Sequence, residues 1–328
     1  MNQIPLNIGV MGCASIAERM VIPAILQTPC YRLKMIASRT AAKAEALAAK
    51  FGVQGVAVYE KLLESEEIDA VYMPLPTALH AEWALRSLEA GKHVLLEKSL
   101  ACNLTEAETI VSAARKANRL VMENFMFVHH PQLSFIKSIV SEGRLGKIHC
   151  LRSSFGFPPF PDSGNIRYSR ELGGGALLDA GAYTVKVSTE ILGASVRVAA
   201  SSLSMDPLKG VDIRGGIFLT GPEGAVIETA FGFDHFYQCS LEIWGNRGRL
   251  TANRIFTAGP GVQPLVILEE PGNTERFELA ADNHFVNLLS YMAEKIRTTD
   301  FEEEYNKILQ QASLLQESRD KALIHMME

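Results

Sequence analysis

Three side chains in two separate segments of the sequence could act together on a carbonyl group. Lys98 follows the apolar run Val94–Leu96, and Asp179 and Tyr183 follow the glycines Gly173–Gly175. A lysine at the carboxyl end of a strand lies where open α/β sheets place their chemistry. An Asp and a Tyr four positions apart share one face of a helix. A cation, a carboxylate and a phenol can together protonate a carbonyl oxygen while a cofactor delivers hydride to its carbon.

The division of roles among these three residues stays open. In one interpretation Tyr183 donates the proton and the Lys98 ammonium stabilises phenolate and alkoxide charge, because a free tyrosine has a pKa of about 10 and is a slow proton shuttle on its own. In another, Lys98 is itself the acid. Asp179 would orient a substrate hydroxyl or hold Lys98 in place. The structural alternatives are a half-buried helix aromatic for Tyr183 and a surface cation for Lys98.

The first part of the chain has the alternating pattern of an α/β protein. Apolar runs predict strands, with helical stretches between them, at residues 6–11, 33–37, 68–73, 94–97 and 120–123. Strands that alternate with helices at this spacing are typical of a parallel, doubly wound sheet. We therefore expect residues 1–123 to form an NAD(P)-binding Rossmann domain.

The pattern changes in the second part, which we expect to form a separate domain over residues 124–328. A chain of this length exceeds what one core usually organises. After a helix near residues 131–142 and a half-exposed strand at 148–157, successive strands with turn signals run from 196 to 277. Meandering strands favour an antiparallel sheet. A helical tail is expected at residues 283–327.

The turn after the first strand carries an imperfect dinucleotide-binding pattern, Gly12-x-Ala14-x-x-Ala17. The start of the following helix offers backbone amides and a favourable dipole to a pyrophosphate, and small residues allow its close approach. An ordinary strand–helix turn is the alternative. The residues expected to contact the cofactor here are Gly12, Cys13, Ala14, Ser15 and Ile16.

The end of the second strand favours NADP(H) over NAD(H). An acid there binds the ribose 2′-hydroxyl of NAD, whereas an arginine accommodates the 2′-phosphate of NADP. The chain has Ser38, Arg39 and Thr40 at this place and no acid before Glu45. Hydroxyls and a guanidinium are good phosphate ligands. The alternative is a solvated arginine on a loop.

Further cofactor contacts are expected at the ends of the next strands. Pro74 and Leu75 lie in a turn that should pass under the cofactor. His80, in the first turn of the following helix, either contacts the cofactor or holds the turn. Glu97 either binds the nicotinamide ribose hydroxyls or forms a salt bridge.

Composition excludes several classes of function. The net charge of -5 and the sequence pI near 6.0 argue against a nucleic-acid partner. The five cysteines are scattered without a CxxC pair, so we expect no metal site and a reducing, cytoplasmic location. The start of the chain lacks the pattern of a signal peptide. No apolar window is long enough to predict a membrane span.

These motifs together resemble the glucose–fructose oxidoreductase / inositol dehydrogenase (Gfo/Idh/MocA) family along almost the whole chain. The segments Met122–Pro131, Gly164–Tyr168 and Phe231–His235 resemble one branch, the NADPH-dependent sugar 3-ketoreductases of deoxysugar biosynthesis. The family resemblance implies a Rossmann domain followed by an α/β domain with a large, open, mostly antiparallel sheet. The branch implies reduction of the C3 ketone of a nucleotide-linked keto-sugar.

The resemblance also suggests further ligand contacts and an assembly. Asn124 and Arg167 are expected near the cofactor, although a loop salt bridge is the alternative for Arg167. His129 is expected to line the sugar pocket, with interdomain packing as its alternative, and Tyr237 to lie near the nucleotide of the substrate. The open sheet face implies a homodimer or homotetramer.

The sequence departs from the family pattern at two positions, and two alternative functions stay open. Ser99 replaces the usual proline after Glu97-Lys98, and Ala14 replaces a usual glycine. Many family members have histidine where this chain has Tyr183. The alternative functions are an NADP-dependent dehydrogenase of a free sugar or trans-dihydrodiol, and a non-catalytic NADP-binding regulator.

Overall fold

The computed structural model describes residues 4–162 and 164–328. Met1–Gln3 lie outside the described residues. They are part of the segment in which the sequence shows no signal-peptide pattern. Among the described residues, no helix combines the length and apolar character needed to cross a membrane.

Packing divides the chain into two compact units, each with its own sheet. The first comprises Met1–Asn124 and Phe285–Ala312, and the second Phe125–His284 and Ser313–Glu328. The predicted boundary at residue 123 therefore leaves out a later segment that packs with the first unit. The Tyr305 hydroxyl donates a hydrogen bond to the Arg119 carbonyl oxygen at 2.6 Å, and the Phe301 ring lies 6.0 Å from that of His93. These polar and aromatic contacts bring the segment back to the first unit.

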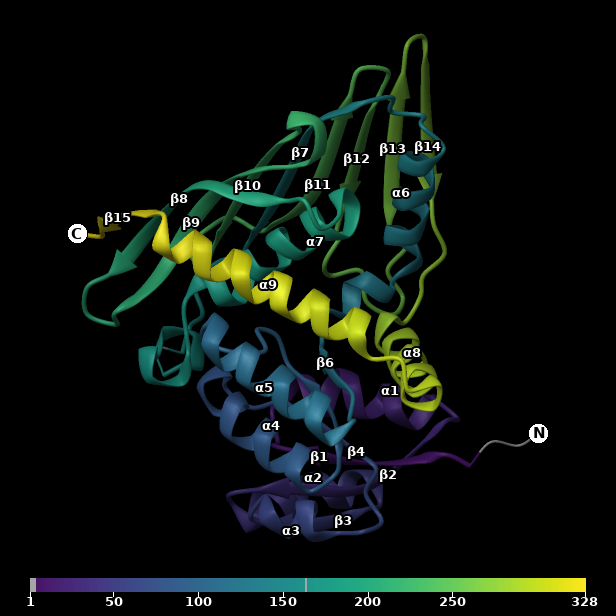
Figure 1. Ribbon diagram of the computed structural model, residues 1–328, viewed down its shortest axis with the longest axis vertical. Coiled ribbons are helices and arrows are strands. Elements are labelled where there is room, and N and C mark those ends of the chain that lie inside the picture. Colours follow the sequence, from purple (N-terminus) through teal and green to yellow (C-terminus); the bar gives the residue numbers. More distant parts are fainter. Residues whose placement is uncertain (1–3, 163) are drawn as a thin grey trace. The chain divides into compact units, whose positions relative to one another are not determined.

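The first unit contains a six-stranded parallel sheet in the order β3-β2-β1-β4-β5-β6 (Figure 1). This order is that of a dinucleotide-binding doubly wound sheet, and it confirms the predicted fold class. Ligands bind such sheets outside the carboxyl ends of the strands, where the order reverses between β1 and β4. The strands are β1 (Leu6–Met11), β2 (Tyr31–Ser38), β3 (Gln54–Ala57), β4 (Ala70–Met73), β5 (His93–Leu96) and β6 (Val121–Glu123).

Helices connect these strands and bury their own apolar faces against the sheet. The α5 helix begins with a side-chain cap, because Asn103 accepts a hydrogen bond from the Glu106 amide at 2.9 Å. The short η2 helix begins at Thr77, directly after the turn that contains Pro74 and Leu75. The helical segments are η1 (Ala17–Val21), α1 (Ile22–Gln27), α2 (Ala41–Phe51), α3 (Glu60–Glu64), η2 (Thr77–Leu79), α4 (His80–Glu89), α5 (Leu104–Ala117), α8 (His284–Thr298) and α9 (Glu302–Asp320), the last two spanning the boundary between units.

The second unit contains a nine-stranded sheet in the order β14-β13-β12-β11-β7-β10-β9-β8-β15. Most neighbours are antiparallel, as predicted, but β7 pairs with β10 and β8 with β15 in parallel. The strands are β7 (Ile148–Gly156), β8 (Arg197–Asp206), β9 (Val211–Thr220), β10 (Val226–Gly232), β11 (Gln238–Gly245), β12 (Arg249–Asn253), β13 (Leu265–Glu270), β14 (Asn273–Glu278) and β15 (Ala322–Met326).

One face of this sheet packs against helices, and the core lies in that layer. The α7 helix contacts β7 and β10, and Figure 1 shows α6 and α7 against the sheet. Phe231, Phe233 and Phe256 are fully buried there. The helical segments are η3 (Met126–His129), α6 (Pro131–Ser141), η4 (Ile166–Tyr168), η5 (Arg170–Leu172), η6 (Leu177–Gly181), α7 (Ala182–Leu192) and η7 (Pro222–Gly224).

Candidate active site

The turn after β1 needs a glycine at position 12. Gly12 has a φ of +128°, which side chains rarely adopt, and its amide donates a hydrogen bond to the Ala37 carbonyl oxygen at 2.9 Å. A Cβ here would lie 3.1 Å from Leu75 Cδ2 and 3.4 Å from the Pro74 carbonyl oxygen. The turn therefore packs closely on the loop after β4, as the dinucleotide pattern predicts.

The helix after this turn is irregular. Its first hydrogen bond runs from the Glu18 amide to the Ala14 carbonyl oxygen at 3.2 Å, and a π-helical segment, Ala17–Val21, follows. Pro23 at the start of α1 explains the wide turn, because its nitrogen cannot donate to the preceding turn. The helix still begins immediately after the turn, so its first amides point toward the expected pyrophosphate position.

The end of β2 brings together groups that suit a phosphate. Ser38 is buried, and its hydroxyl accepts a hydrogen bond from the Thr40 amide at 3.2 Å. Arg39 is exposed and lies near the phenol of Tyr59. Burial raises the pKa of Tyr59, and the neighbouring guanidinium partly offsets the shift. Tyr59 was not foreseen from the sequence, because a lone tyrosine after β3 has no motif.

His80 holds two loops together. Its side chain is fully buried, with Nδ1 3.0 Å from the Ser99 carbonyl oxygen and Nε2 2.9 Å from that of Leu75. Burial lowers its pKa to about 4, so the ring is neutral at ordinary pH. Because the ring has no exposed surface, the structure supports the holding role predicted for His80 and not direct contact with a cofactor.

Glu97 lies at the carboxyl end of β5 in a network of hydrogen bonds. Its Oε1 accepts hydrogen bonds from the Tyr72 hydroxyl at 2.6 Å and from Asn124 Nδ2 at 2.7 Å. Burial raises the pKa of Glu97, while these two donors and the adjacent Lys98 act in the opposite direction. Two neutral polar side chains, Tyr72 and Asn124, therefore hold Glu97 at the end of the strand. Tyr72 was not predicted, since it lies inside an apolar strand.

Lys98 follows β5 directly and is half-buried in the first unit. The peptide bond between Lys98 and Ser99 is cis, although Ser99 stands where the family usually has proline. Lys98 therefore occupies the strand end that the sequence predicts.

The carboxyl edge of the first sheet fits a nicotinamide dinucleotide. Gly12 allows the turn after β1 to lie close to Leu75 in the loop after β4. The Oδ1 atom of Asn124 is buried without a hydrogen-bond partner in the described structure. Among residues 4–162 and 164–328, no group of three or more His, Cys, Asp or Glu side chains could hold a metal ion.

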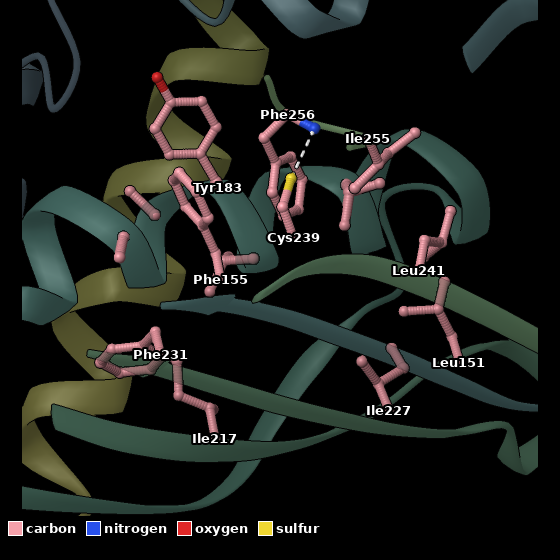
Figure 2. Packing of buried hydrophobic residues seen from close by; sticks show 14 of the residues in the cluster. Leu151, Phe155, Tyr183, Ile217, Ile227, Phe231, Cys239, Leu241, Ile255 and Phe256 are labelled. Carbon is pink, nitrogen blue, oxygen red and sulfur yellow. Dashed lines mark hydrogen bonds between the residues drawn. The ribbon is translucent and has the colours of Figure 1, made fainter. Parts of the chain in front are cut away.

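Tyr183 lies in the second unit, in the first turn of α7, and is surrounded by aromatic rings. The ring centroids of Phe125, Phe155 and Phe256 lie 5.5, 5.2 and 5.4 Å from its own. Its hydroxyl lies 3.6 Å from Met126 Sδ. Figure 2 shows the oxygen pointing away from the apolar cluster below the ring. The rings fix the phenol while its hydroxyl stays at the edge of the cluster.

Asp179 precedes Tyr183 on the π-helical segment η6 and pairs with Arg167. Arg167 Nε donates a hydrogen bond to Asp179 Oδ2 at 2.5 Å. The Arg167 guanidinium also lies 4.8 Å from the centre of the Phe160 ring. The loop salt bridge considered as an alternative for Arg167 is therefore present, and this carboxylate is its partner.

The remaining predicted ligand residues of the second unit are His129, in a short 3-10 helix, and Tyr237, on the loop before β11. His129 is half-buried at the end of η3. Its neighbour His130 is buried and caps α6, accepting a hydrogen bond from the Gln132 amide at 3.0 Å. Tyr237 is 37% exposed, with its hydroxyl 2.7 Å from Thr257 Oγ1. Its partial exposure leaves the ring available to a ligand.

Comparison with known families agrees with this geometry. The sheet order and the Gly12 turn define the class of nicotinamide-dinucleotide-binding Rossmann proteins. Residues 6–125 match the oxidoreductase family with an NAD-binding Rossmann fold, and residues 134–251 match the GFO/IDH/MocA C-terminal domain. The chain belongs to the GFO/IDH/MocA oxidoreductase family, which confirms the resemblance inferred from the motifs.

Individual relatives cover nearly the whole chain. A dTDP-3,4-didehydro-2,6-dideoxy-alpha-D-glucose 3-reductase from Actinomadura kijaniata is 39% identical over 98% of this chain and 97% of its own. A D-xylose 1-dehydrogenase (NADP(+)) 2 from Haloferax volcanii is 33% identical over 77% of each. Among solved structures, a 3-ketoreductase from Actinomadura kijaniata in complex with NADP and TDP-benzene has a TM-score of 0.95 at 38% identity, covering 99% of this chain and 100% of that one.

Proposed function

We propose that this protein uses NADPH to reduce the C3 ketone of a nucleotide-linked keto-deoxysugar. The observation that carries the proposal is similarity over most of the chain to four dTDP-3,4-didehydro-2,6-dideoxy-alpha-D-glucose 3-reductases, which are 36% to 39% identical. The relative named as a D-xylose dehydrogenase matches less of the chain at lower identity.

The proposed preference for NADPH rests on the end of β2. Arg39 and the hydroxyls of Ser38 and Thr40 would hold the 2′-phosphate, and no acid stands there to select the 2′-hydroxyl of NADH. The turn after β1 would hold the pyrophosphate through Gly12, Cys13, Ala14, Ser15 and Ile16.

The nicotinamide half would lie over the carboxyl ends of β4 and β5. Pro74 and Leu75 would support it, and Glu97 with its partner Asn124 would lie beside the nicotinamide ribose. When bound, the cofactor supplies hydride to the carbonyl carbon. Lys98 would contribute positive charge next to this end of the cofactor.

We assign the proton chemistry to Tyr183, Lys98 and Asp179. Tyr183 donates the proton from its hydroxyl to the ketone oxygen, and the Lys98 ammonium stabilises negative charge on that oxygen. Asp179, held by Arg167, orients a hydroxyl of the sugar. His129 would contact the sugar, and Tyr237 the nucleotide portion of the substrate.

The test measures NADPH oxidation by absorbance with a dTDP-linked 3-keto-deoxysugar. We expect turnover with NADPH, poor turnover with NADH, and a kcat for Tyr183→Phe at least about 100-fold below that of the wild type, because a positioned acid contributes about that much. NADPH binding, followed by fluorescence, should be unchanged in this variant. Tyr305→Phe removes a phenol hydrogen bond within the first unit and serves as the matched control.

Other outcomes assign other functions. No keto-sugar turnover in a wild type that binds NADPH would overturn the proposal. Oxidation of a free aldose or a trans-dihydrodiol with NADP+ would then indicate the activity named for other relatives. NADPH binding without turnover on any of these substrates would indicate a regulator.

We also propose that the protein forms a homodimer or homotetramer and works in the cytoplasm. Trp244 in β11 is 51% exposed and Phe218 in β9 is 41% exposed, which gives the sheet apolar side chains at its surface. All five cysteines are free thiols, which suits a reducing compartment. Light scattering at micromolar concentration tests the assembly, and a monomer would contradict it. Cell fractionation tests the location.

A further inference from the structure

Asp212, in β9, is a partly buried carboxylate that the proposed mechanism does not use. Its Oδ2 accepts a hydrogen bond from the Leu177 amide at 2.5 Å. Burial raises the pKa of Asp212, whereas the amides of Leu177 and Ala176 and the Arg319 cation favour its charged form. The carboxylate thus lies at the amino end of the helical segment that begins at Ala176.

This contact replaces a local helix cap. The helix starts after Gly175, which has no side chain, and the segment has no side-chain cap of its own. The first amides of a helix lack partners within the helix, so an acceptor from elsewhere must satisfy them. A cap from the same chain segment would hold only the helix end. A cap from β9 ties that end to the sheet.

The glycines before the helix allow the close contact between Asp212 and the start of the helix. Gly175 has a φ of +119°, and a Cβ on it would overlap Asp212 Oδ1. A Cβ on Gly174 would overlap the Arg167 carbonyl oxygen. The backbone of the Arg167 loop, the carboxylate of Asp212 and the start of the helix therefore meet at two glycines, and larger residues would separate them.

The tied segment carries both of the proposed catalytic residues of the second unit. Asp179 and Tyr183 follow the capped amide of Leu177 on η6 and the first turn of α7. The η6 turn is π-helical, and such turns are often found at functional sites. The position of the Tyr183 hydroxyl therefore depends on where the helix begins as well as on the rings around it.

We propose that Asp212 is a positioning residue, which fixes the start of the helix so that Tyr183 and Asp179 keep their places for the reaction. The inference rests on the roles given to these two residues under the proposed function. A displacement of about 1 Å at a reacting group can lower a rate by about 100-fold. Loss of the Asp212 cap should therefore lower kcat more than it affects binding of NADPH.

The test compares Asp212→Ala with Asn103→Ala, which removes the cap of α5 at a helix without proposed site residues. For Asp212→Ala we expect kcat to fall by about 10- to 100-fold while the Kd for NADPH changes less than about threefold. Amide hydrogen exchange should speed up in the peptide covering residues 176–184. For Asn103→Ala we expect faster exchange only near residues 103–107 and a kcat within about twofold of the wild type.

The exchange measurement needs no substrate, so it separates this inference from the proposed function. Wild-type exchange at residues 176–184 in Asp212→Ala, or a loss of kcat no larger than in Asn103→Ala, would overturn the positioning role. If Asp212→Ala does not fold, Asp212→Asn keeps the size and one acceptor oxygen and should show an intermediate loss. Gly175→Ala, which pushes against the carboxylate, should reproduce the Asp212→Ala exchange pattern. A Gly175→Ala variant with wild-type exchange would count against the proposal.

Discussion

Arg39 is the side chain on which the proposed choice of cofactor depends. It is exposed directly after β2, near the phenol of Tyr59. A guanidinium binds phosphate through two parallel hydrogen bonds. The 2′-phosphate is the group that distinguishes NADPH from NADH, so a change at Arg39 should affect only one of them.

We expect Arg39→Ala to raise the Kd for NADPH by at least about tenfold, because a hydrogen bond to a charged group contributes about 1.5–3 kcal/mol. The Kd for NADH should stay within about twofold. Fluorescence titration of both cofactors measures the two values. Arg32→Ala removes an exposed arginine from the same strand and is the control. An equal loss for NADPH and NADH would contradict a 2′-phosphate contact.

Residue types could be predicted at the site, but their contacts could not. The motif around Gly12 predicts a glycine in the turn after β1, and the positive φ explains it. The spacing of Asp179 from Tyr183 gives no sign that Arg167 is its partner, because that partner comes from a loop without regular structure. Asp212 has no motif, since an acid in a strand usually faces solvent.

The two helices that begin beside candidate site residues share an irregular first turn. Both start with π-helical segments, Ala17–Val21 and Leu177–Gly181, where the sequence predicts ordinary helices. Pro23 accounts for the first of them. At the second, a Cβ on Gly181 would lie 3.1 Å from the Phe231 ring, so the small residue allows the helix to approach β10.

The contact between the cofactor and the turn before the first of these helices can be tested by adding a single methyl group to the turn. Gly12→Ala should raise the Kd for NADPH by at least about tenfold, because the added Cβ requires a strained φ and moves the turn against Leu75. Gly52→Ala is the matched control, since Gly52 also has a positive φ but a Cβ there meets nothing within 4 Å. It should cost about 1 kcal/mol of unfolding free energy without changing NADPH binding. Similar Kd values for the two variants would show that the turn does not contact the cofactor.

Most elements could be predicted, but short or distant ones could not. The apolar runs predict β1, β2, β4, β5 and β6 because these strands are buried on both faces. Gln54–Ala57 was missed, because a four-residue edge strand with exposed positions has no clear period. The expected helical tail ends earlier, since Ala322–Met326 pairs with β8 as β15, and pairing with a strand so far away in sequence leaves no local signal.

At the scale of the whole molecule, the strand arrangement of the first sheet can be predicted from the helices that connect its strands, whereas that of the second sheet cannot. Strands joined by helices must run parallel, which limits the possible orders. In the second sheet, β7 lies between β10 and β11, although two strands separate it from β10 in the chain and three separate it from β11. The family resemblance supplied the open sheet, and the sequence pattern alone predicted only its antiparallel character.

The stability of both units should fall as the pH drops from 7 to 5, because histidines are buried in the neutral form. Burial lowers the pKa of His80 to about 4 and that of His284 to about 3, against an ordinary value of 6.5. Burial also lowers the pKa of His93 to about 4, and its Nδ1 accepts a hydrogen bond from the Leu120 amide at 2.9 Å. Between pH 6.5 and these values the unfolded chain binds more protons, so the unfolding free energy rises with pH. This stabilisation is present above about pH 6.5 and is lost toward pH 4.

Burial raises the pKa of Glu97 and Asp212, so these two carboxylates make the unfolding free energy fall as the pH rises, opposite to the histidines. A comparison of histidine variants therefore isolates the contribution of the histidines. For a fully buried histidine such as His80 the loss at pH 5 amounts to about 2 kcal/mol. Urea unfolding at pH 7 and pH 5 should therefore show a pH effect about 2 kcal/mol smaller in His80→Gln than in the wild type. His149→Gln, at an exposed position of β7, should keep the wild-type pH effect. The same pH effect in His80→Gln and the wild type would mean that His80 is not buried in the neutral form.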